Sequence, residues 1–218
     1  MRDTALTSPI SDETEAPRLN RRQAAKVRTR QKVLDAARAL FAERGYEPAT
    51  IRDIARGAGM STGAVFANFQ DKAELFEAVL SEDMVKLAET LKGAAAGEGS
   101  VKSRLMAALT AGYHNSLEQL PLVQAVIARS WFQPVEAEVR TRAAIRPLLA
   151  VITDTLQSGV AGGQIKQDAD VRLLSELVYD AYLSNYRRAA YDGWALEQMT
   201  TRMAKQLDVV LAGALSRQ

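Results

Sequence analysis

The sequence predicts an all-α protein of about nine helices, with a short N-terminal three-helix unit followed by a larger C-terminal helical domain. Apolar residues recur at helical spacing through most of the 218 residues, and no segment keeps the period of two that marks a strand. Charge is uneven: residues 18–72 carry a net charge of +7, whereas residues 1–17 and 73–218 carry −3 and −2. A basic segment of this kind is typical of a module that faces a polyanion, although a solvated helix face would give the same pattern.

The composition excludes several classes of site. The chain has no cysteine, which rules out disulfides, thiolate metal sites and cysteine nucleophiles, and its single histidine, His114, cannot build the usual metal clusters. No apolar run approaches the roughly 18 residues of a membrane helix, and residues 1–17 lack the pattern of a signal peptide. We therefore expect no metal, no cofactor, no membrane partner and a cytoplasmic location.

The first helix is expected to follow a disordered tail. Residues 1–20 are rich in Ser, Thr, Pro and acidic residues and show no period. From Val27 the apolar residues take up helical spacing, and Gly45 can end that helix in the left-handed conformation. The apolar stripe of this helix consists of Val33, Leu34, Ala37, Leu40 and Phe41.

Two short helices should come next. Residues 50–53 (Thr-Ile-Arg-Asp) resemble a capping box with Asp in the place usual for Glu, which marks a helix start. Gly59 can end this helix, and Ser61 can cap the following one. The residues expected to face inward are Ile51, Ile54, Ala55 and Ala58 in the first of them, and Val65, Phe66 and Phe69 in the second.

The remaining helices are longer. A capping box at residues 71–74 opens a long helix, which ends before a glycine-rich loop at 93–99. Pro121 and Pro134 suit first-turn positions, whereas Pro147 lies inside a helical pattern and predicts a kink or a restart. Further helices are expected at 101–119, 121–131, 134–158, 170–190 and 195–215. We place the domain boundaries so that residues 21–72 form the three-helix unit and residues 73–218 the larger domain.

The segment from Thr50 to Phe69 has the spacing of a helix-turn-helix. Ala55 is small where the two helices would cross, and Gly59 permits the turn. If the second helix enters the major groove of DNA, the positions that face the bases are Thr62, Gly63, Ala64, Ala67 and Asn68. A helical hairpin that binds nothing is the alternative.

The run from Val33 to Leu80, VLDAARALFAERGYEPATIRDIARGAGMSTGAVFANFQDKAELFEAVL, resembles the DNA-binding domain of tetracycline-repressor-like (TetR) transcriptional regulators. In that family the recognition helix typically reads Gly-x-hydrophobic-Tyr-x-His/Tyr-Phe, followed by a Lys in the next helix. Here the matching residues run from Gly63 to Phe69, followed by Lys72. Phe66 stands where the family usually has a tyrosine that contacts phosphate, so the resemblance also makes Phe66 a candidate DNA contact. Asn68 replaces the usual His or aromatic residue.

Each candidate DNA contact has a chemical reason. Hydroxyls at helix starts, those of Thr50 and Ser61, suit phosphate oxygens, and Lys72 can add a point charge to the same backbone. Arg52 is interpreted as the one long cation on this surface that could bond guanine, while methyl groups of Thr62, Ala64 and Ala67 could contact thymine. Four basic residues precede the predicted first helix: Arg18, Arg21, Arg22 and Lys26. They can follow the phosphates or enter the minor groove of DNA, or they can form a plain solvated tail.

A competing motif points to an enzyme. Residues 59–63 match Gly-x-Ser-x-Gly, the nucleophile elbow of serine hydrolases, and His114 could act as base with Asp71 or Asp83 as its orienter. That elbow needs a strand before the serine, and the sequence predicts a helix there. We therefore expect a protein that is not an enzyme.

The larger domain is expected to bind an effector and to dimerise. The resemblance implies an effector pocket, for which the most suitable lining residues are Met106, Tyr113, His114, Trp131 and Phe132, each of which is otherwise ordinary core or helix edge. The last two helices carry apolar residues on more than one face, which predicts a four-helix interface between two copies, unless the helices are buried in their own subunit. The candidate interface residues are Leu173, Leu177, Ala181, Ser184, Leu207 and Leu211.

These observations favour a homodimeric DNA-binding transcriptional regulator, interpreted as a repressor that a small-molecule effector releases from a palindromic operator. The alternative function is a helical small-molecule-binding or scaffold protein that does not bind DNA.

Overall fold

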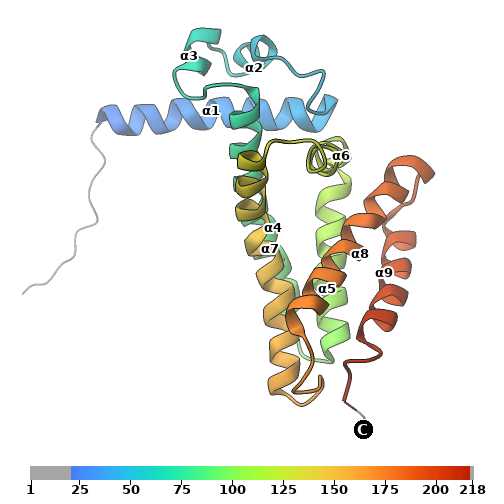
Figure 1. Ribbon diagram of the computed structural model, residues 1–218. Helices are drawn as coiled ribbons and strands as arrows, with labels where there is room; N and C mark the ends of the chain where they lie inside the picture. Colours follow the sequence, from blue (N-terminus) through green and yellow to red (C-terminus); the bar gives the residue numbers. More distant parts are fainter. Residues whose placement is uncertain (1–20, 217–218) are drawn as a thin grey trace, which may run out of the picture.

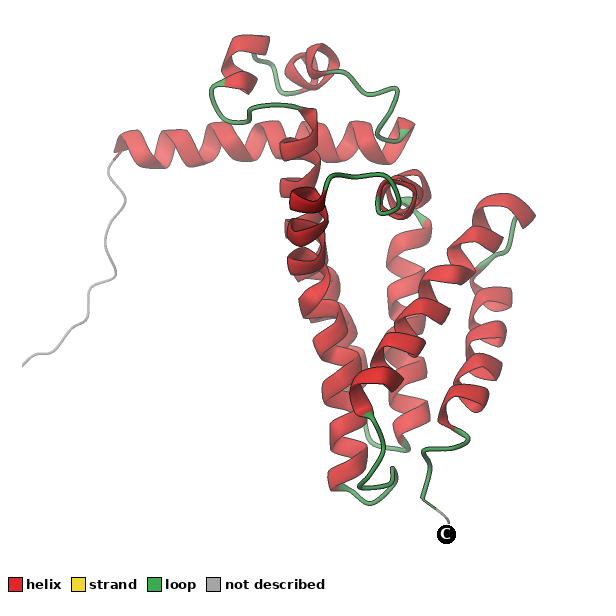
Figure 2. Cartoon of the chain, in the orientation of Figure 1, coloured by secondary structure: helices red, strands yellow, loops and turns green. Residues whose placement is uncertain are grey.

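The computed structural model describes residues 21–216, which form nine α-helices. Figure 2 shows helices and loops and no strand in this part of the chain. One isolated β-bridge joins Ile165 and Leu215. The all-α prediction is confirmed; the tail expected at residues 1–20 lies outside the described residues. The helices are α1 Arg21–Arg44, α2 Ile51–Gly57, α3 Thr62–Phe66, α4 Lys72–Ala95, α5 Val101–Leu117, α6 Leu120–Arg129, α7 Val135–Ala161, α8 Val171–Asp192 and α9 Leu196–Leu211.

The helices form two units joined by α4. In Figure 1 α1 lies across the top with α2 and α3 above it, and α4 leaves this unit and runs downward. The helices α5, α7, α8 and α9, together with the later turns of α4, form the lower part of the molecule, and α6 lies beneath α1. The first turns of α4 pack in the upper core and its later turns pack in the lower unit, so α4 belongs to both.

The predicted helix starts in the N-terminal unit are confirmed by their caps. The side chains of Thr50, Ser61 and Asp71 each accept a hydrogen bond from the backbone N–H three residues later. Gly45 and Gly59 take positive φ angles of 79° and 66°, the left-handed conformation that allows the chain to turn after α1 and α2. These local signals fix the lengths of the loops that orient α2 and α3.

Several helix boundaries differ from the prediction. α4 continues to Ala95, into the loop expected at 93–99, and α9 ends at Leu211 rather than near residue 215. α1 begins at Arg21 rather than near Val27, because its first turns are solvated and carry no apolar stripe to detect. Pro134 caps α7 instead of lying in its first turn, and α7 continues through Pro147 without a restart. The carbonyl at residue 143 that Pro147 leaves without a helical partner lies on an exposed residue, where water can bond to it.

Two features that the composition argues against concern the described helices. None of them is long and apolar enough to cross a membrane. Within residues 21–216 no group of three His, Asp or Glu side chains is placed to hold a metal ion.

Candidate DNA-binding surface

α2 and α3 are held on α1 by a small apolar core. Ile54 and Ala55 from α2 and Val65 from α3 are buried against Phe41 of α1. Phe69, just after α3, is buried in the same core. This packing turns the opposite face of both helices outward, as the helix-turn-helix interpretation requires. The predicted DNA-facing residues that are exposed there are Thr50, Arg52, Ser61, Thr62, Gly63, Phe66 and Ala67, whereas Ala64 and Asn68 are half-buried.

Phe66 lies on the outer face, and its predicted inward role is wrong. It is 55% exposed, whereas Val65 is fully buried and Phe69 is 2% exposed. Successive residues of a helix are about 100° apart, so Val65 and Phe69 share one side and Phe66 points away from it. The candidate DNA-binding surface therefore carries an apolar ring without a hydroxyl.

The two capping hydroxyls are not equivalent. Ser61 Oγ accepts a hydrogen bond from the Ala64 N–H at 3.2 Å, which leaves its own proton for an outside acceptor such as a phosphate. Thr50 Oγ1 accepts from the Asp53 N–H and also donates to an Asp53 carboxylate oxygen at 2.7 Å. That bond, aided by nearby arginines, lowers the pKa of Asp53, so the carboxylate stays ionised at the start of α2.

Arg56 is a cation that the sequence argument missed. Its side chain is 74% exposed and its guanidinium pairs with Asp53 at 3.0 Å. Arg52 is therefore not the one long cation of this surface. The spacing of four residues between Arg52 and Arg56, which places two side chains on one helix face, was the available signal.

Asn68 also has a structural role. Its Nδ2 donates to the backbone oxygen of Ala64 at 2.9 Å, and its backbone oxygen accepts from Arg30 at 3.1 Å. The guanidinium of Arg30 lies 4.1 Å from the centre of the Phe69 ring. Arg30 thus ties the end of α3 to α1, and an adenine contact by Asn68 requires its amide to turn away from Ala64.

Lys72 is half-buried and its ammonium group bonds the backbone of the chain itself, which argues against its predicted phosphate contact. Its Nζ donates to the backbone oxygens of Tyr46, Glu47 and Ala49 at 2.9, 3.2 and 3.1 Å. A lysine has three N–H donors, and all three are used. The loop before α2 turns these carbonyls inward, so Lys72 holds that loop in place.

The basic residues before the predicted first helix belong to α1 itself. Arg21, Arg22 and Lys26 lie in its exposed first turns, so these three are not an extended arm, and Arg18 lies outside the described residues. In Figure 1 this part of α1 reaches beyond α3 and α4. A helical position suits contacts along a phosphate backbone rather than insertion into a minor groove.

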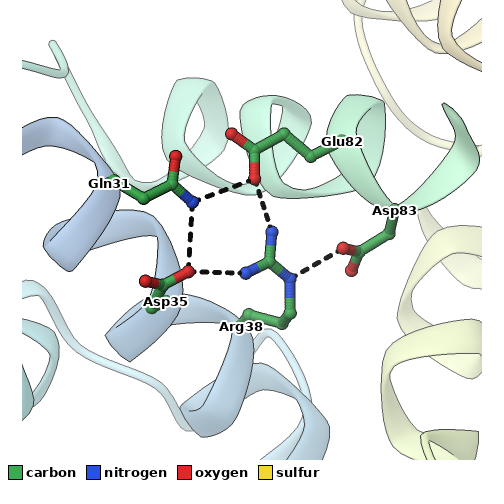
Figure 3. Close-up of polar contacts among 5 residues, drawn as sticks. All are labelled: Gln31, Asp35, Arg38, Glu82 and Asp83. Carbon is green, nitrogen blue, oxygen red and sulfur yellow. Dashed lines mark hydrogen bonds and ion pairs between the residues drawn. The ribbon is translucent and has the colours of Figure 1, made fainter. Parts of the chain in front are cut away.

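A polar cluster fixes the angle between α1 and α4 (Figure 3). The Arg38 guanidinium bonds Asp83 and Glu82, both at 2.7 Å, and Asp35 at 2.9 Å. Gln31 donates to Asp35 and Glu82 at the outer edge of the cluster. Burial raises the pKa of Asp83 even though Arg38 opposes this shift, and the second Asp83 oxygen is buried without a partner among the described residues.

The residues expected to line an effector pocket are not brought together. Tyr113 is fully buried in the lower core, whereas Trp131 and Phe132 are 80% and 92% exposed. His114 is exposed one position from Tyr113, because neighbouring helical residues point about 100° apart. Met106 packs at the edge of the lower core. Clefts of about 360 Å³ between α4 and α7 and about 310 Å³ between the ends of α8 and α9 are lined by other residues.

The candidate dimer residues divide into two groups. Leu173 and Leu177 of α8 are 50% and 44% exposed, and Ala181 and Ser184 continue the same face. Leu207 and Leu211 of α9 are buried in their own subunit, so their predicted place in an interface is wrong. The apolar stripe of α9 lies on a single face, with Met199, Met203, Leu207 and Leu211 all turned inward.

The hydrolase motif does not form a nucleophile elbow. Ser61 caps α3 directly after α2, with no strand before it in this described part of the chain. His114 lies on α5 in the lower unit. The serine therefore lacks the strand-to-helix turn that this chemistry needs.

Comparison with known proteins points in one direction. Residues 33–79 match the profile of the family described as "Bacterial regulatory proteins, tetR family". The HTH-type transcriptional repressor AcnR of Corynebacterium efficiens is 48% identical over 65 residues, which cover 30% of this chain and 35% of that relative. The chain thus spans about a third of the length of AcnR, and the match is confined to the size of one small domain.

Two further proteins match over most of their length. The HTH-type transcriptional repressor KstR2 of Mycolicibacterium smegmatis is 30% identical over 155 residues, which cover 69% of this chain and 74% of that repressor. The crystal structure of the regulator FadR of Bacillus subtilis in complex with stearoyl-CoA superimposes with a TM-score of 0.73. That match has 18% identity and covers 84% of this chain and 98% of FadR, which shows a shared fold.

Proposed function

This chain belongs to the TetR family of bacterial regulatory proteins, and we propose that it is a homodimeric repressor released from a palindromic operator by a small effector. The observation that carries the proposal is the outer face of α2 and α3. It combines exposed cations, a free hydroxyl at a helix start and an exposed ring on a basic three-helix unit. Phosphate contacts, base contacts and register could all come from that one face.

Dimerisation follows from the size of this face. One α3 of five residues reads only a few base pairs, whereas two copies related by a two-fold axis read half-sites about 34 Å apart. The exposed leucines of α8 offer an apolar surface for the pairing. Since DNA is the proposed partner, the cytoplasm is where the protein would act.

The effector is proposed to bind within the lower unit. FadR was crystallised with stearoyl-CoA, so a long-chain acyl-CoA is the first effector to test. Nearly complete release needs about 5.5 kcal/mol of preference for the conformation that does not fit DNA. We expect calorimetry to show that stearoyl-CoA binds the protein, and we expect bound stearoyl-CoA to weaken operator binding. If a different class of small molecule releases the operator instead, the acyl-CoA is rejected as the effector but the repressor function is retained.

The experiment that tests the function is selection of bound duplexes from a random DNA pool. Enrichment of a palindrome, with affinity that falls steeply as salt rises, is the expected result. No enrichment, and equal weak binding to all duplexes, would favour the alternative of a helical small-molecule-binding or scaffold protein.

We expect Arg52→Ala to relax sequence preference at one base position of the selected operator. The guanidinium is exposed on the proposed DNA-facing side of α2, where a bidentate contact with guanine contributes about 1–3 kcal/mol of discrimination. Affinities for the operator and for single-base variants, measured at fixed salt, check this. Arg142→Ala, at an exposed arginine of α7 outside both proposed surfaces, is the matched control for loss of one charge. Equal losses on all DNAs would assign Arg52 to phosphate contact instead.

We expect Phe66→Tyr to strengthen binding to all DNA sequences modestly. The ring is already exposed, so a hydroxyl can be added without burying it, and one new phosphate bond contributes about 0.5–1.5 kcal/mol. Titration of operator and scrambled duplexes should show parallel gains. Unchanged affinity on both would mean that this ring does not reach the phosphates.

A further inference from the structure

α6 is shared between the two units of the molecule. Leu122, Ala125 and Val126 pack in the upper core with α1, α2 and α3. Leu120, Val123 and Ile127 pack against the lower core built from α5, α8 and α9. Within each set the residues are three or four positions apart, so each set forms one face of the helix and α6 contacts both units at once.

Arg129, the last residue of α6, reaches into the upper unit. Its guanidinium lies 4.1 Å from the centre of the Tyr46 ring and 5.4 Å from that of Phe76. Tyr46 is only 8% exposed, and cation–π attraction strengthens where water is excluded. Arg129 therefore contacts the loop that joins α1 to α2, although it belongs to a helix outside the helix-turn-helix.

The same ring has a second cation. Lys72 Nζ lies 4.2 Å from the Tyr46 ring centre and bonds the backbone oxygens of residues 46, 47 and 49. The next residue, Thr50, caps α2. An unbroken series of contacts thus runs from α6 through Arg129, the Tyr46 ring and Lys72 to the start of α2.

We propose that Arg129, Tyr46 and Lys72 form a positioning relay that sets where α2 begins, and through α2 how α3 is presented to DNA. The proposal rests on the proposed function, which it deepens by naming a route of regulation. An effector that shifts α6 would withdraw Arg129 from the ring, and the loop at 46–49 would lose a partner on the side of the effector domain. These residues act through the loop and need not touch DNA.

The test compares Arg129→Met, which removes the charge and keeps an unbranched stem, with Arg129→Lys, which keeps the charge. Arg142→Met, at an exposed arginine of α7 paired with Glu138, is the control for loss of charge. We expect Arg129→Met to weaken binding to the selected operator about fivefold to tenfold, Arg129→Lys to restore most of it, and Arg142→Met to change it less than twofold. Equal losses in Arg129→Met and Arg142→Met would overturn the relay, because general charge would then explain both.

A double-mutant cycle separates the relay from a direct DNA contact. In a Tyr46→Leu background the ring is absent, so Arg129→Met should cost less than twofold further. An undiminished loss in that background would overturn the proposal. If Tyr46→Leu fails to fold, the same cycle with Lys72→Met is used.

Amide hydrogen exchange of the DNA-free protein gives a readout that does not depend on the proposed function. Arg129→Met should raise exchange at residues 46–57, while residues 101–117 of α5 remain unchanged. Unchanged exchange at 46–57 would sink the relay even if the protein binds DNA. Raised exchange in a protein that selects no DNA would instead retain the relay and reject the proposed function.

Discussion

A Leu177→Glu variant should be a folded monomer with operator affinity reduced at least about 100-fold. Leu177 is 44% exposed in the isolated subunit, so the carboxylate remains solvated and the helical content should not change. In a dimer built on α8 the same charge would be buried without a partner, which costs several kcal/mol. Sedimentation for mass, circular dichroism for helicity and operator titration check the three parts of this result.

Two control variants make the result specific. Val85→Glu adds the same charge at a 52% exposed position on α4, away from the proposed interface, and should leave mass and affinity unchanged. Leu211→Glu places the charge at a position 1% exposed in the subunit core, so this variant should unfold the lower unit instead of separating dimers. A dimer that survives Leu177→Glu would place the interface away from this face of α8.

The helix-turn-helix could be predicted in detail because its signals are local. The caps at Thr50, Ser61 and Asp71 each involve a backbone group three residues away, and the turns at Gly45 and Gly59 depend on a single residue's φ angle. The same holds for the buried spacing of Val65 and Phe69, which lie one helical turn apart. Contacts between residues so close along the chain can be predicted from the local sequence pattern.

The roles of single side chains in the candidate site depended on distant parts of the chain. Lys72 is occupied by carbonyls more than 20 residues before it, which no local pattern reveals. One of the two cations that contact the Tyr46 ring is Arg129, which comes from a helix assigned to the other domain. Composition suggested that Trp131 and Phe132 would line a pocket, but the turn between α6 and α7 leaves both in solvent.

The C-terminal helices show a different limit of prediction from sequence. Apolar residues on several faces of these helices predicted an interface between two copies, yet the pattern does not say which face turns inward within one subunit. Tertiary packing decides this: α9 directs its whole stripe into the subunit, and α8 keeps two leucines outside. The predicted interface residues of α8 therefore remain candidates, whereas those of α9 do not.

Gly159→Ala should destabilise the protein by about 2–3 kcal/mol, the upper part of the range for an overpacked core. A Cβ at Gly159 in α7 would lie 2.2 Å from Val101 Cγ2 and 3.2 Å from Ile165 Cδ1. Val101 is a stiff β-branched residue at the start of α5, and its N–H is bonded to the Gln164 side chain at 2.7 Å. Relief of the overlap therefore requires α5 and α7 to separate.

Gly93→Ala is the matched control, since Gly93 is also helical but a Cβ there would meet no atom within 4 Å. There the loss of chain entropy in the unfolded state and the better helix propensity of alanine should stabilise the protein by about 0.5–1 kcal/mol. Urea unfolding at one pH should give shifts of opposite sign for the two variants. Equal stabilisation by both would mean that α5 and α7 can move apart freely at this junction, because the helix propensity of alanine would then be the only effect left.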